Sequence, residues 1–227
     1  MLEKRLTLFA GHYGSGKTNI AVNFALTLAR SGKNVCIADL DIVNPYFRTA
    51  DSAQELAEAG VTLISPKFAN SNVDLPALPA EAYRLVTDKT AYGIMDIGGD
   101  DRGAYALGRY TPAILEENNY RMVYVANCCR PLTRTADDAL EVMREIEAAC
   151  GLRFTHIINN SNLGPETTPQ VVLDSLPFAQ ELSRISGLPL WLHSIRQDLL
   201  PALQGSGLPL FPMQLQKKHF DFPADFR

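Results

Sequence analysis

Residues 11–18 read GHYGSGKT and fit the pattern G-x-x-x-x-G-K-[S/T]. Glycines at these spacings let successive backbone N–H groups turn inward and form a cradle for an anion. An apolar run at residues 5–10 precedes the segment, and apolar side chains recur every four residues after it, at Ile20, Phe24 and Leu28. These patterns predict a buried strand and an amphipathic helix. The segment is therefore a predicted phosphate loop, toward which the positive end of the helix dipole points.

The side chains of this loop are of the types that bind a nucleoside triphosphate. The ammonium group of Lys17 can reach the β- and γ-phosphates, and the hydroxyl of Thr18 can coordinate Mg²⁺, which prefers oxygen ligands. Lys17 is therefore a predicted catalytic residue, and Thr18 is a predicted metal ligand. The predicted nucleotide-binding residues of the loop and the first helical turn are Gly14, Ser15, Gly16, Lys17, Thr18 and Asn19.

A dinucleotide-binding loop is the rival interpretation of the same glycines. Gly14 and Gly16 supply G-x-G, and Asp39 lies about 20 residues further on, where such folds place a ribose-binding acid. The third small residue of that fingerprint would fall on Asn19, however, and the lysine and threonine after Gly16 would have no role. A nucleoside triphosphate is the better interpretation.

Strand and helix patterns alternate along the chain without a compositional break. This alternation predicts an α/β fold with a doubly wound, mostly parallel sheet of about seven strands and helices on both faces. We expect one nucleotide-binding domain at residues 1–204 and a tail at residues 205–227 that packs on the domain or is partly flexible. The predicted strands are residues 5–10, 34–40, 61–64, 92–97, 122–126, 154–158 and 188–192.

Composition excludes several classes of function. Of the 227 residues 46% are apolar, and 21 Lys and Arg against 25 Asp and Glu give a net charge of −4, whereas nucleic-acid-binding surfaces are strongly basic. No run approaches the ~18 apolar residues of a membrane-spanning helix. The four cysteines form no C-x-x-C pair, which favours a reducing compartment. We expect a cytoplasmic protein that binds no nucleic acid and does not span a membrane.

Acidic residues follow two of the predicted strands, in the segments Asp39–Pro45 and Asp96–Asp101. In a parallel sheet these positions lie at the same edge as the phosphate loop, where acids manage Mg²⁺ and the attacking water. Capping of a following helix is the alternative explanation for such an acid. For Asp100 and Asp101 both explanations remain open, and for the acids nearer the strand ends we expect a functional role.

The phosphate loop, the D-x-D-x-x-x-P stretch at 39–45 and the D-x-G-G stretch at 96–99 resemble, in order and spacing, the MinD/ParA/CobQ-like P-loop NTPases of the SIMIBI class. The resemblance covers roughly residues 5–200 and implies ATP and Mg²⁺ as cofactors. It also implies that Asp39 and Asp96 hold Mg²⁺ through water, and that Asp41 positions or activates the hydrolytic water. Asn159 or Asn160 would contact adenine, because these residues follow a strand as the family's base-reading asparagine does.

One departure from that family concerns an additional lysine near the start of the loop. In many members this lysine reaches across a dimer to the partner's nucleotide, whereas here the position holds His12, followed by Tyr13. An additional cation accelerates phosphoryl transfer by ~10³–10⁵, and a histidine with a pKa near 6.5 is an unreliable replacement at neutral pH. The departure therefore implies slow intrinsic hydrolysis and argues against a sandwich dimer built on that lysine.

Three functions are compatible with this resemblance. The first is a slow Mg-ATP-dependent switch, in which nucleotide orders residues 39–48 and 96–103 and changes the surface offered to a protein partner or a second copy of the chain. The second is an ATP-dependent ligase or synthetase of the dethiobiotin or cobyrinate type. The third is a kinase, with Asp41 as the base for an acceptor hydroxyl. The fold does not decide among them.

A few residues outside these motifs are weaker candidates. Cys128 and Cys129 could bind a metal, although buried thiols that only pack are the simpler interpretation. Arg130 and Arg134 are candidates for an anion contact, against an ordinary solvated helix start. Finally, the proline-rich segment 65–79 could carry a substrate or partner contact, since long loops are often functional.

Overall fold

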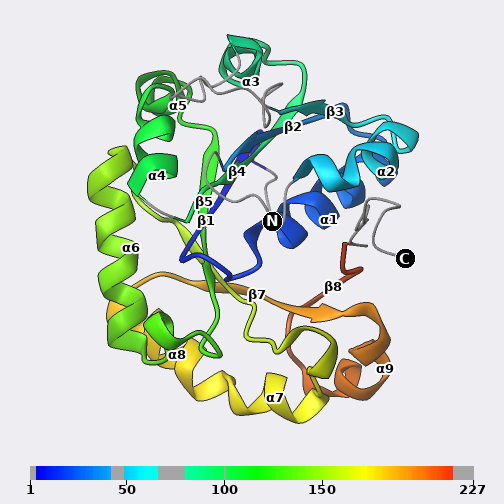
Figure 1. Cartoon of the computed structure of the whole chain (residues 1–227), viewed down its shortest axis with the longest axis vertical. Helices are drawn as coiled ribbons and strands as arrows, with labels where there is room; N and C mark the ends of the chain where they lie inside the picture. The colour runs from blue at the N-terminus through cyan, green and yellow to red at the C-terminus, as the bar shows by residue number, and fades with distance from the viewer. Residues whose placement is uncertain (1–3, 42–48, 66–79, 100, 217–227) are drawn as a thin grey trace, which may run out of the picture.

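A computed structural model describes residues 4–41, 49–65, 80–99 and 101–216 of the chain. Within these residues lie nine α-helices and eight strands (Figure 1). The strands are β1 (Leu6–Ala10), β2 (Val35–Leu40), β3 (Thr62–Ile64), β4 (Tyr92–Ile97), β5 (Tyr120–Ala126), β6 (His156–Asn159), β7 (Leu190–Arg196) and β8 (Leu210–Met213). The helices are α1 (Lys17–Arg30), α2 (Ala53–Glu58), α3 (Arg84–Thr87), α4 (Asp101–Gly108), α5 (Thr111–Glu117), α6 (Ala136–Cys150), α7 (Pro169–Asp174), α8 (Leu176–Ser186) and α9 (Leu200–Leu203).

All neighbouring strands pair in parallel, in the order β3-β2-β4-β1-β5-β6-β7-β8. The chain after β1 crosses over β4 to build β2 and β3 on one side, and from β5 onward it builds the other side. The carboxyl end of β1 therefore lies where the direction of winding changes. In open α/β sheets this is the position at which ligands bind.

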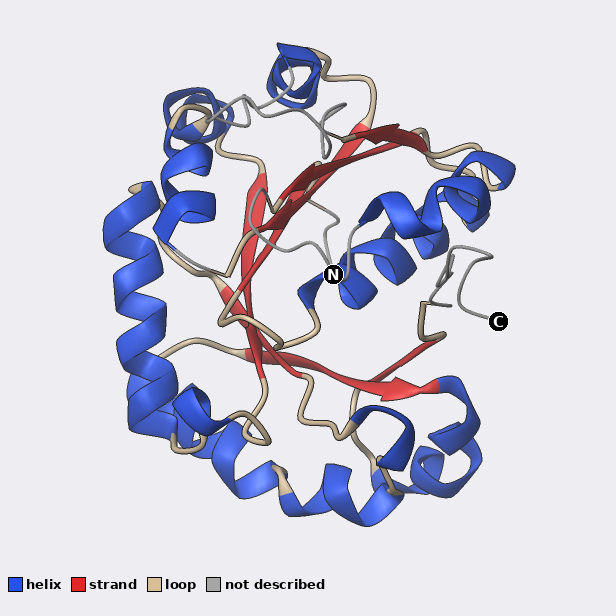
Figure 2. Ribbon diagram, in the orientation of Figure 1, coloured by secondary structure: helices blue, strands red, loops and turns tan. Residues whose placement is uncertain are grey.

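The sheet is covered by helices on both faces (Figure 2). Side chains of α1 and α2 pack on one face, in a cluster that includes Ile20, Leu56 and Phe9. Residues of α3, α4, α5, α6 and α8 pack on the other face, in a cluster that includes Leu8 and Tyr124. Strand residues that alternate between the two faces are buried on both, as the near-continuous apolar runs of the sequence predict.

The predicted doubly wound α/β fold is confirmed, with one strand more than expected. The addition is β8, which lies at the edge of the sheet and contains Pro212. Proline lacks a backbone donor and is tolerated in edge strands, so its presence concealed the strand in the sequence. Because β8 belongs to the sheet, residues 210–213 of the predicted tail are part of the folded domain.

Two segments of helical sequence pattern, at 101–118 and 170–186, each form two helices in the structure. The segment expected to form one helix at 101–118 is split between α4 and α5, with Pro112 in the first turn of α5, where proline is favoured. At 170–186 the sequence predicts a helix interrupted near Pro177, and the structure confirms the interruption, with Ser175 between α7 and α8. Within the described residues, no helix has both the length and the apolar character needed to cross a membrane.

Candidate functional site

The predicted phosphate loop joins the carboxyl end of β1 to the first turn of α1. Gly14 and Gly16 have φ angles of 74° and 91°, in the left-handed region that favours glycine, and Gly16 is the N-cap residue of α1. The backbone N–H of Ser15 donates to the His12 carbonyl at 3.1 Å and closes the loop. The Lys17 ammonium donates to the same carbonyl at 3.4 Å, so the lysine side chain folds back over the phosphate loop.

A second feature of this loop is an unsatisfied hydroxyl group. Ser15 is buried, and its Oγ has no hydrogen-bond partner among the described residues. A buried polar atom without a partner is costly unless a ligand or water supplies one. The open donor of Ser15 therefore fits the phosphate oxygens that the loop is predicted to bind.

The loop is braced from the neighbouring side of the sheet by Asn160. The Nδ2 of Asn160 donates to the Ser15 carbonyl at 2.6 Å, and the Oδ1 of Asn160 accepts a hydrogen bond of 2.7 Å from the Ser194 hydroxyl. A Cβ at Gly16 would collide with the Asn160 amide, so the second glycine of the motif is required by packing as well as by its φ angle. Strands β6 and β7 thus position the phosphate loop.

The glycines of the D-x-G-G stretch make equally close backbone contacts. A Cβ at Gly99 would lie 2.6 Å from the backbone nitrogen of Tyr13, in the phosphate loop. A Cβ at Gly103, in α4, would lie 2.6 Å from the Cα of Gly98. These contacts place the segment after β4 directly against the phosphate loop, and no larger residue fits at either position.

The three predicted acids gather at the same edge of the sheet. Asp39 and Asp96 lie opposite each other on β2 and β4, and the Oδ1 of Asp39 accepts a hydrogen bond of 3.0 Å from the backbone N–H of Asp41. All three are buried. The Thr49 hydroxyl donates to the Oδ2 of Asp96 at 3.1 Å, and among the described residues the Oδ1 of Asp96 has no hydrogen-bond partner.

Burial governs the protonation of Asp96. It raises the pKa of this carboxyl to about 6, against the opposing effect of the Lys17 ammonium and of hydrogen bonds from Thr18 and Thr49. The nearby Asp41 carboxylate raises the pKa further. A divalent cation would reverse this balance, because it favours the ionised carboxylate.

The oxygen atoms at this edge fit Mg²⁺. The Thr18 hydroxyl and the carboxylates of Asp39 and Asp96 are hard oxygen donors. The unpaired Oδ1 of Asp96 leaves one buried acceptor available for a metal-bound water. Their roles as metal ligands remain predictions that the geometry accommodates.

The side chains of the predicted adenine-binding asparagines are engaged within the protein. The Nδ2 of Asn159 lies 2.8 Å from the Ser175 hydroxyl and 3.2 Å from Nδ1 of His193. Its Oδ1 accepts hydrogen bonds from Ser161. With Asn160 bound to Ser15, both asparagines order the ends of β6 and β7, and an adenine contact by either remains a prediction.

A small pocket beside them is lined by residues that include Asn162, Thr167, Arg196, Met213 and Leu215.

The remaining loop residue, Asn19, connects α1 to the end of the described chain. Its Oδ1 accepts a hydrogen bond of 2.9 Å from the backbone N–H of Gln216. One turn later, Asn23 exchanges two hydrogen bonds with the backbone of Gln214. Asn19 and Asn23 therefore hold residues 214–216 against the helix, and a nucleotide contact from Asn19 stays a prediction.

The weaker candidates divide into one residue at the site and several away from it. The Nε of Arg130 donates to the Gly14 carbonyl at 2.8 Å, which places this arginine on the phosphate loop. Arg134 is exposed. Cys128 and Cys129 are partly buried thiols, and no group of three or more metal-binding side chains occurs in the described part of the chain. Most of the 65–79 segment, with Lys67, Asn70, Asn72 and Asp74, lies outside the described residues.

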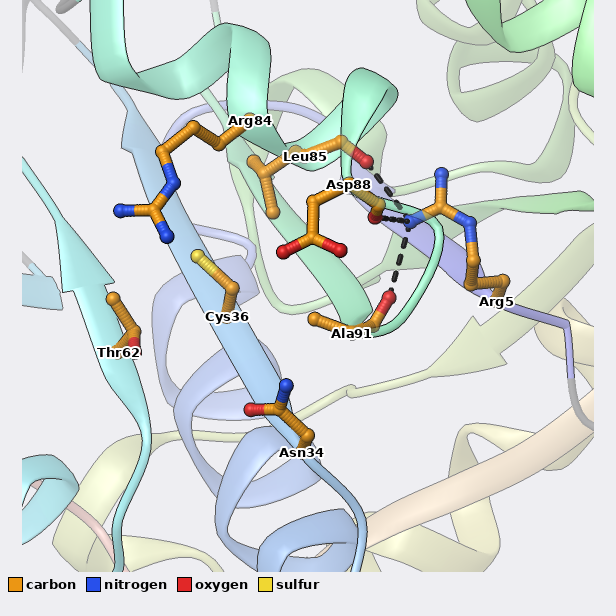
Figure 3. A pocket seen from close by; sticks show the side chains of 8 residues that line it. All are labelled: Arg5, Asn34, Cys36, Thr62, Arg84, Leu85, Asp88 and Ala91. Carbon is orange, nitrogen blue, oxygen red and sulfur yellow. Dashed lines mark hydrogen bonds between the residues drawn. The ribbon is translucent and has the colours of Figure 1, made fainter.

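A separate pocket lies at the opposite edge of the sheet, at the amino ends of β1, β2 and β3 (Figure 3). Its volume is about 70 Å³, enough for only a few water molecules, and its lining includes Cys36, Arg84 and Asp88. Burial raises the pKa of the Cys36 thiol to about 11, so the sulfur is unreactive at neutral pH. This pocket lies far from the phosphate loop and is not the functional site.

Two residues of the site went unnoticed in the sequence. Thr49 follows the first acidic stretch, Asp39–Pro45, with no pattern of its own, and only the fold brings it to Asp96 at the second stretch. Ser194 was hidden because the last strand was expected to end at residue 192, whereas β7 continues to Arg196. Of residues 193–196 only Ile195 favours a strand, so no local signal indicates the longer strand.

Comparison with known proteins supports this fold. No protein-family model and no curated protein matches the chain. Among solved structures, cell division protein FtsY from Thermotoga maritima matches 86% of the chain at 17% identity and a TM-score of 0.56. Signal recognition particle 54 kDa protein from Aeropyrum pernix K1, in complex with GDP, matches 82% at 17% identity and a TM-score of 0.50. A nucleotide-binding protein from Archaeoglobus fulgidus, in complex with ADP, matches 87% at 14% identity and a TM-score of 0.50.

These similarities establish the fold, since the identities are low. The chain spans 63% of that FtsY chain and 40% of the signal recognition particle protein, but 85% of the Archaeoglobus protein. The predicted P-loop α/β fold is confirmed. Membership of the MinD/ParA/CobQ-like group within it remains a prediction.

Proposed function

We propose that this protein binds Mg-ATP at residues 11–18 and acts as a slow, nucleotide-dependent switch. The observation that carries the proposal is the presence of two buried polar groups without partners, one in the phosphate loop and one at the end of the neighbouring strand β4. The Ser15 hydroxyl lacks a partner in the loop, and the Oδ1 of Asp96 lacks one at the neighbouring strand end. A phosphate oxygen and a metal-bound water would satisfy the two groups together, which a loop built only for packing would not need.

In this proposal, separate residues bind the phosphates, the metal and the attacking water. The loop amides and the Lys17 ammonium hold the phosphates, while Thr18, Asp39 and Asp96 hold the metal directly or through water. When bound, Mg²⁺ neutralises developing charge on the β- and γ-phosphate oxygens. Asp41 is buried beside Asp39 and, as a carboxylate, can orient a water for attack on the terminal phosphate.

Adenine is the proposed base because of the side chains around the small pocket beside β6. Guanine presents N–H donors on its base-pairing edge and is well matched by a carboxylate acceptor. The lining residues Asn160, Ser161, Asn162, Gly164, Thr167, Ser194 and Arg196 include no carboxylate. Solved structures of similar fold hold GDP in one case and ADP in another, so the fold does not decide the base. The choice of adenine therefore rests on the absence of a carboxylate from the lining of this pocket.

A switch is favoured over a small-molecule enzyme by the side chains that surround the site. Tyr13, Leu132 and Leu163 are 52%, 65% and 45% exposed, and they lie in the loops that follow the adjacent strands β1, β5 and β6. Exposed apolar side chains in loops at the same end of the sheet offer contacts for a protein partner. A nucleotide bound beneath them would alter the surface that a protein partner meets.

The experiment is a measurement of phosphate release together with nucleotide competition. We expect slow, Mg²⁺-dependent ATP turnover that added small-molecule carboxylates and alcohols do not accelerate, and displacement of a fluorescent ATP analogue by ATP in preference to GTP. Rapid unassisted turnover, or turnover that requires an acceptor metabolite, would contradict the switch. Preference for GTP would contradict only the choice of base.

A further inference from the structure

Arg130 lies in the turn after β5, the strand that neighbours β1, and its side chain extends along the phosphate loop. Its Nε donates to the Gly14 carbonyl at 2.8 Å. A Cβ at Gly14 would lie 3.5 Å from this Nε and 3.7 Å from the Cδ, so the aliphatic stem runs in van der Waals contact beside the glycine. The guanidinium group is therefore held at the loop by its innermost nitrogen.

The turn that carries Arg130 is fixed by hydrogen bonds on both sides of the residue. The backbone N–H of Arg130 donates to the Asn127 carbonyl at 3.3 Å, and the Arg130 carbonyl accepts from the Thr133 N–H at 3.2 Å. The Thr133 hydroxyl donates to the Asn127 carbonyl at 2.8 Å, and the Cys128 N–H donates to the Ser161 hydroxyl at 3.1 Å. The base of the arginine is thus well ordered without a nucleotide.

Unlike four other arginines of the chain, Arg130 is not paired with a carboxylate of the described residues. Arg5, Arg153, Arg184 and Arg196 each form an ion pair with a carboxylate. Within the described ranges, Arg130 has no such partner, and its Nε donates to a neutral carbonyl. Four of its five N–H donors, those on the two terminal nitrogens, remain for another acceptor.

The net charge of the site favours an additional cation. Lys17 is one positive charge among three buried carboxylates, Asp39, Asp41 and Asp96. A divalent metal would offset the excess of acids, but a triphosphate would then bring several negative charges of its own. Arginine is suited to this position, because its planar guanidinium group binds phosphate oxygens with two parallel hydrogen bonds.

We propose that Arg130 contacts the β- and γ-phosphates of the nucleotide bound by the same chain, as a second cation beside Lys17. Both cations bond to carbonyls of the short stretch 12–14, the lysine to His12 and the arginine to Gly14, so they converge on the same end of the polyphosphate. This inference rests on the proposed function. Arg130, in the turn after β5, would also provide the second cation that His12 does not reliably provide.

The alternative is that Arg130 only braces the loop through its bond to Gly14. Arg130→Gln separates the two roles, because the glutamine amide nitrogen takes the place of Nε along the side chain and can still donate to the Gly14 carbonyl. The glutamine side chain lacks the positive charge and the terminal N–H groups of the guanidinium. Arg130→Ala removes both the brace and the charge. Arg144→Ala, an exposed arginine on α6, is the control for the change in net charge.

The test is calorimetric titration of each purified variant with a non-hydrolysable ATP analogue, ADP and AMP in the presence of magnesium. We expect Arg130→Gln and Arg130→Ala to bind the triphosphate on the order of 10- to 100-fold more weakly, as for loss of hydrogen bonds to a charged group. ADP should be affected less, AMP unaffected, and Arg144→Ala should bind like the wild type.

Two results would overturn the inference. Triphosphate binding by Arg130→Gln that equals the wild type would leave the arginine only a bracing role, and equal weakening for all three nucleotides would show general damage to the loop. Melting temperatures of the nucleotide-free variants report such damage directly. If the wild-type protein itself binds no nucleotide, the proposed function fails first, and this outcome is distinct from a failure confined to Arg130.

Discussion

The side-chain amide of Asn160 donates a hydrogen bond of 2.6 Å to the backbone carbonyl of Ser15, 145 positions earlier in the chain. The amide oxygen of Asn160 in turn accepts from the Ser194 hydroxyl at 2.7 Å. The phosphate loop is therefore anchored to the ends of β6 and β7 through one side chain whose amide nitrogen and oxygen are both hydrogen-bonded. A loop ordered in advance binds its ligand without the entropic cost of ordering it.

Replacement of Asn160 tests this anchor. Asn160→Asp keeps the shape of the side chain but places a carboxylate oxygen against the Ser15 carbonyl, so we expect Mg-ATP affinity to fall by at least about 10-fold. Asn160→Ala leaves buried polar groups without partners and should destabilise the fold by about 1–3 kcal/mol in urea denaturation. Asn34→Ala, at the exposed amino edge of the sheet, is the control. Wild-type affinity in Asn160→Asp would show that the anchor is dispensable.

Gly99 is expected to tolerate no side chain. The Cβ of Gly99→Ala would lie 2.6 Å from the Tyr13 nitrogen, so either β4 or the phosphate loop must shift. We expect a loss of about 1–3 kcal/mol in stability, accompanied by weaker nucleotide binding. Gly205→Ala is the matched control, because no atom lies within 4 Å of its added Cβ. If the two variants behave alike in thermal unfolding and nucleotide titration, the close contact has no consequence.

The pH dependence of the metal-free protein should depend on Asp96. Its pKa is raised to about 6 from an ordinary value of 3.8, chiefly by burial, so the protonated carboxyl favours the folded state. This contribution is present below about pH 4 and is lost as the pH rises through 6. In EDTA, Asp96→Asn should therefore melt above the wild type at pH 8, by a margin that narrows at pH 5.

The control for this experiment is Glu141→Gln, which neutralises an exposed carboxylate on α6. It should not change the melting profile between pH 5 and 8. Parallel profiles for Asp96→Asn and the wild type would contradict the assignment of Asp96 as a strained, buried acid. They would also weaken the case that its open oxygen is kept for a metal-bound water.

Cys36 should resist alkylation in the folded protein. Burial raises the pKa of its thiol to about 11, whereas Arg84 lowers the pKa and Asp88 raises it. At pH 8 only about one molecule in a thousand would carry the reactive thiolate. Peptide mass spectrometry after timed iodoacetamide treatment should show slow labelling at pH 8 and a marked increase toward pH 10. Labelling as fast as in 8 M urea would show that the thiol is neither buried nor protonated.

The fold could be predicted largely because its signals are local. The G-x-x-x-x-G-K-[S/T] loop, the period-four apolar pattern of α1 and the buried runs of β1, β2 and β4 each arise from neighbouring residues. The eighth strand could not be predicted in the same way. Its four residues include Pro212 and acquire strand geometry only by pairing with β7 at the edge of the sheet.

The candidate site was predictable at the positions where a motif fixes the backbone. Lys17, Asp39 and Asp96 follow from spacing and from the rule that parallel strands end at one edge. The contact between Arg130 and Gly14 joins residues 116 positions apart, and no local sequence pattern predicts it. Long-range hydrogen bonds of this kind depend on the packed arrangement of β1 and β5, so only the structure reveals them.

Titration of the purified protein with Mg-ATP, compared with Lys17→Ala, tests the central claim most directly. We expect saturable heat for the wild type and for Lys89→Ala, which alters an exposed lysine at the opposite edge of the sheet. Binding by Lys17→Ala should be weaker by at least about 10-fold, because a charged hydrogen bond to phosphate is lost. No heat with any adenine or guanine triphosphate, together with no effect of replacing Lys17, would contradict the account.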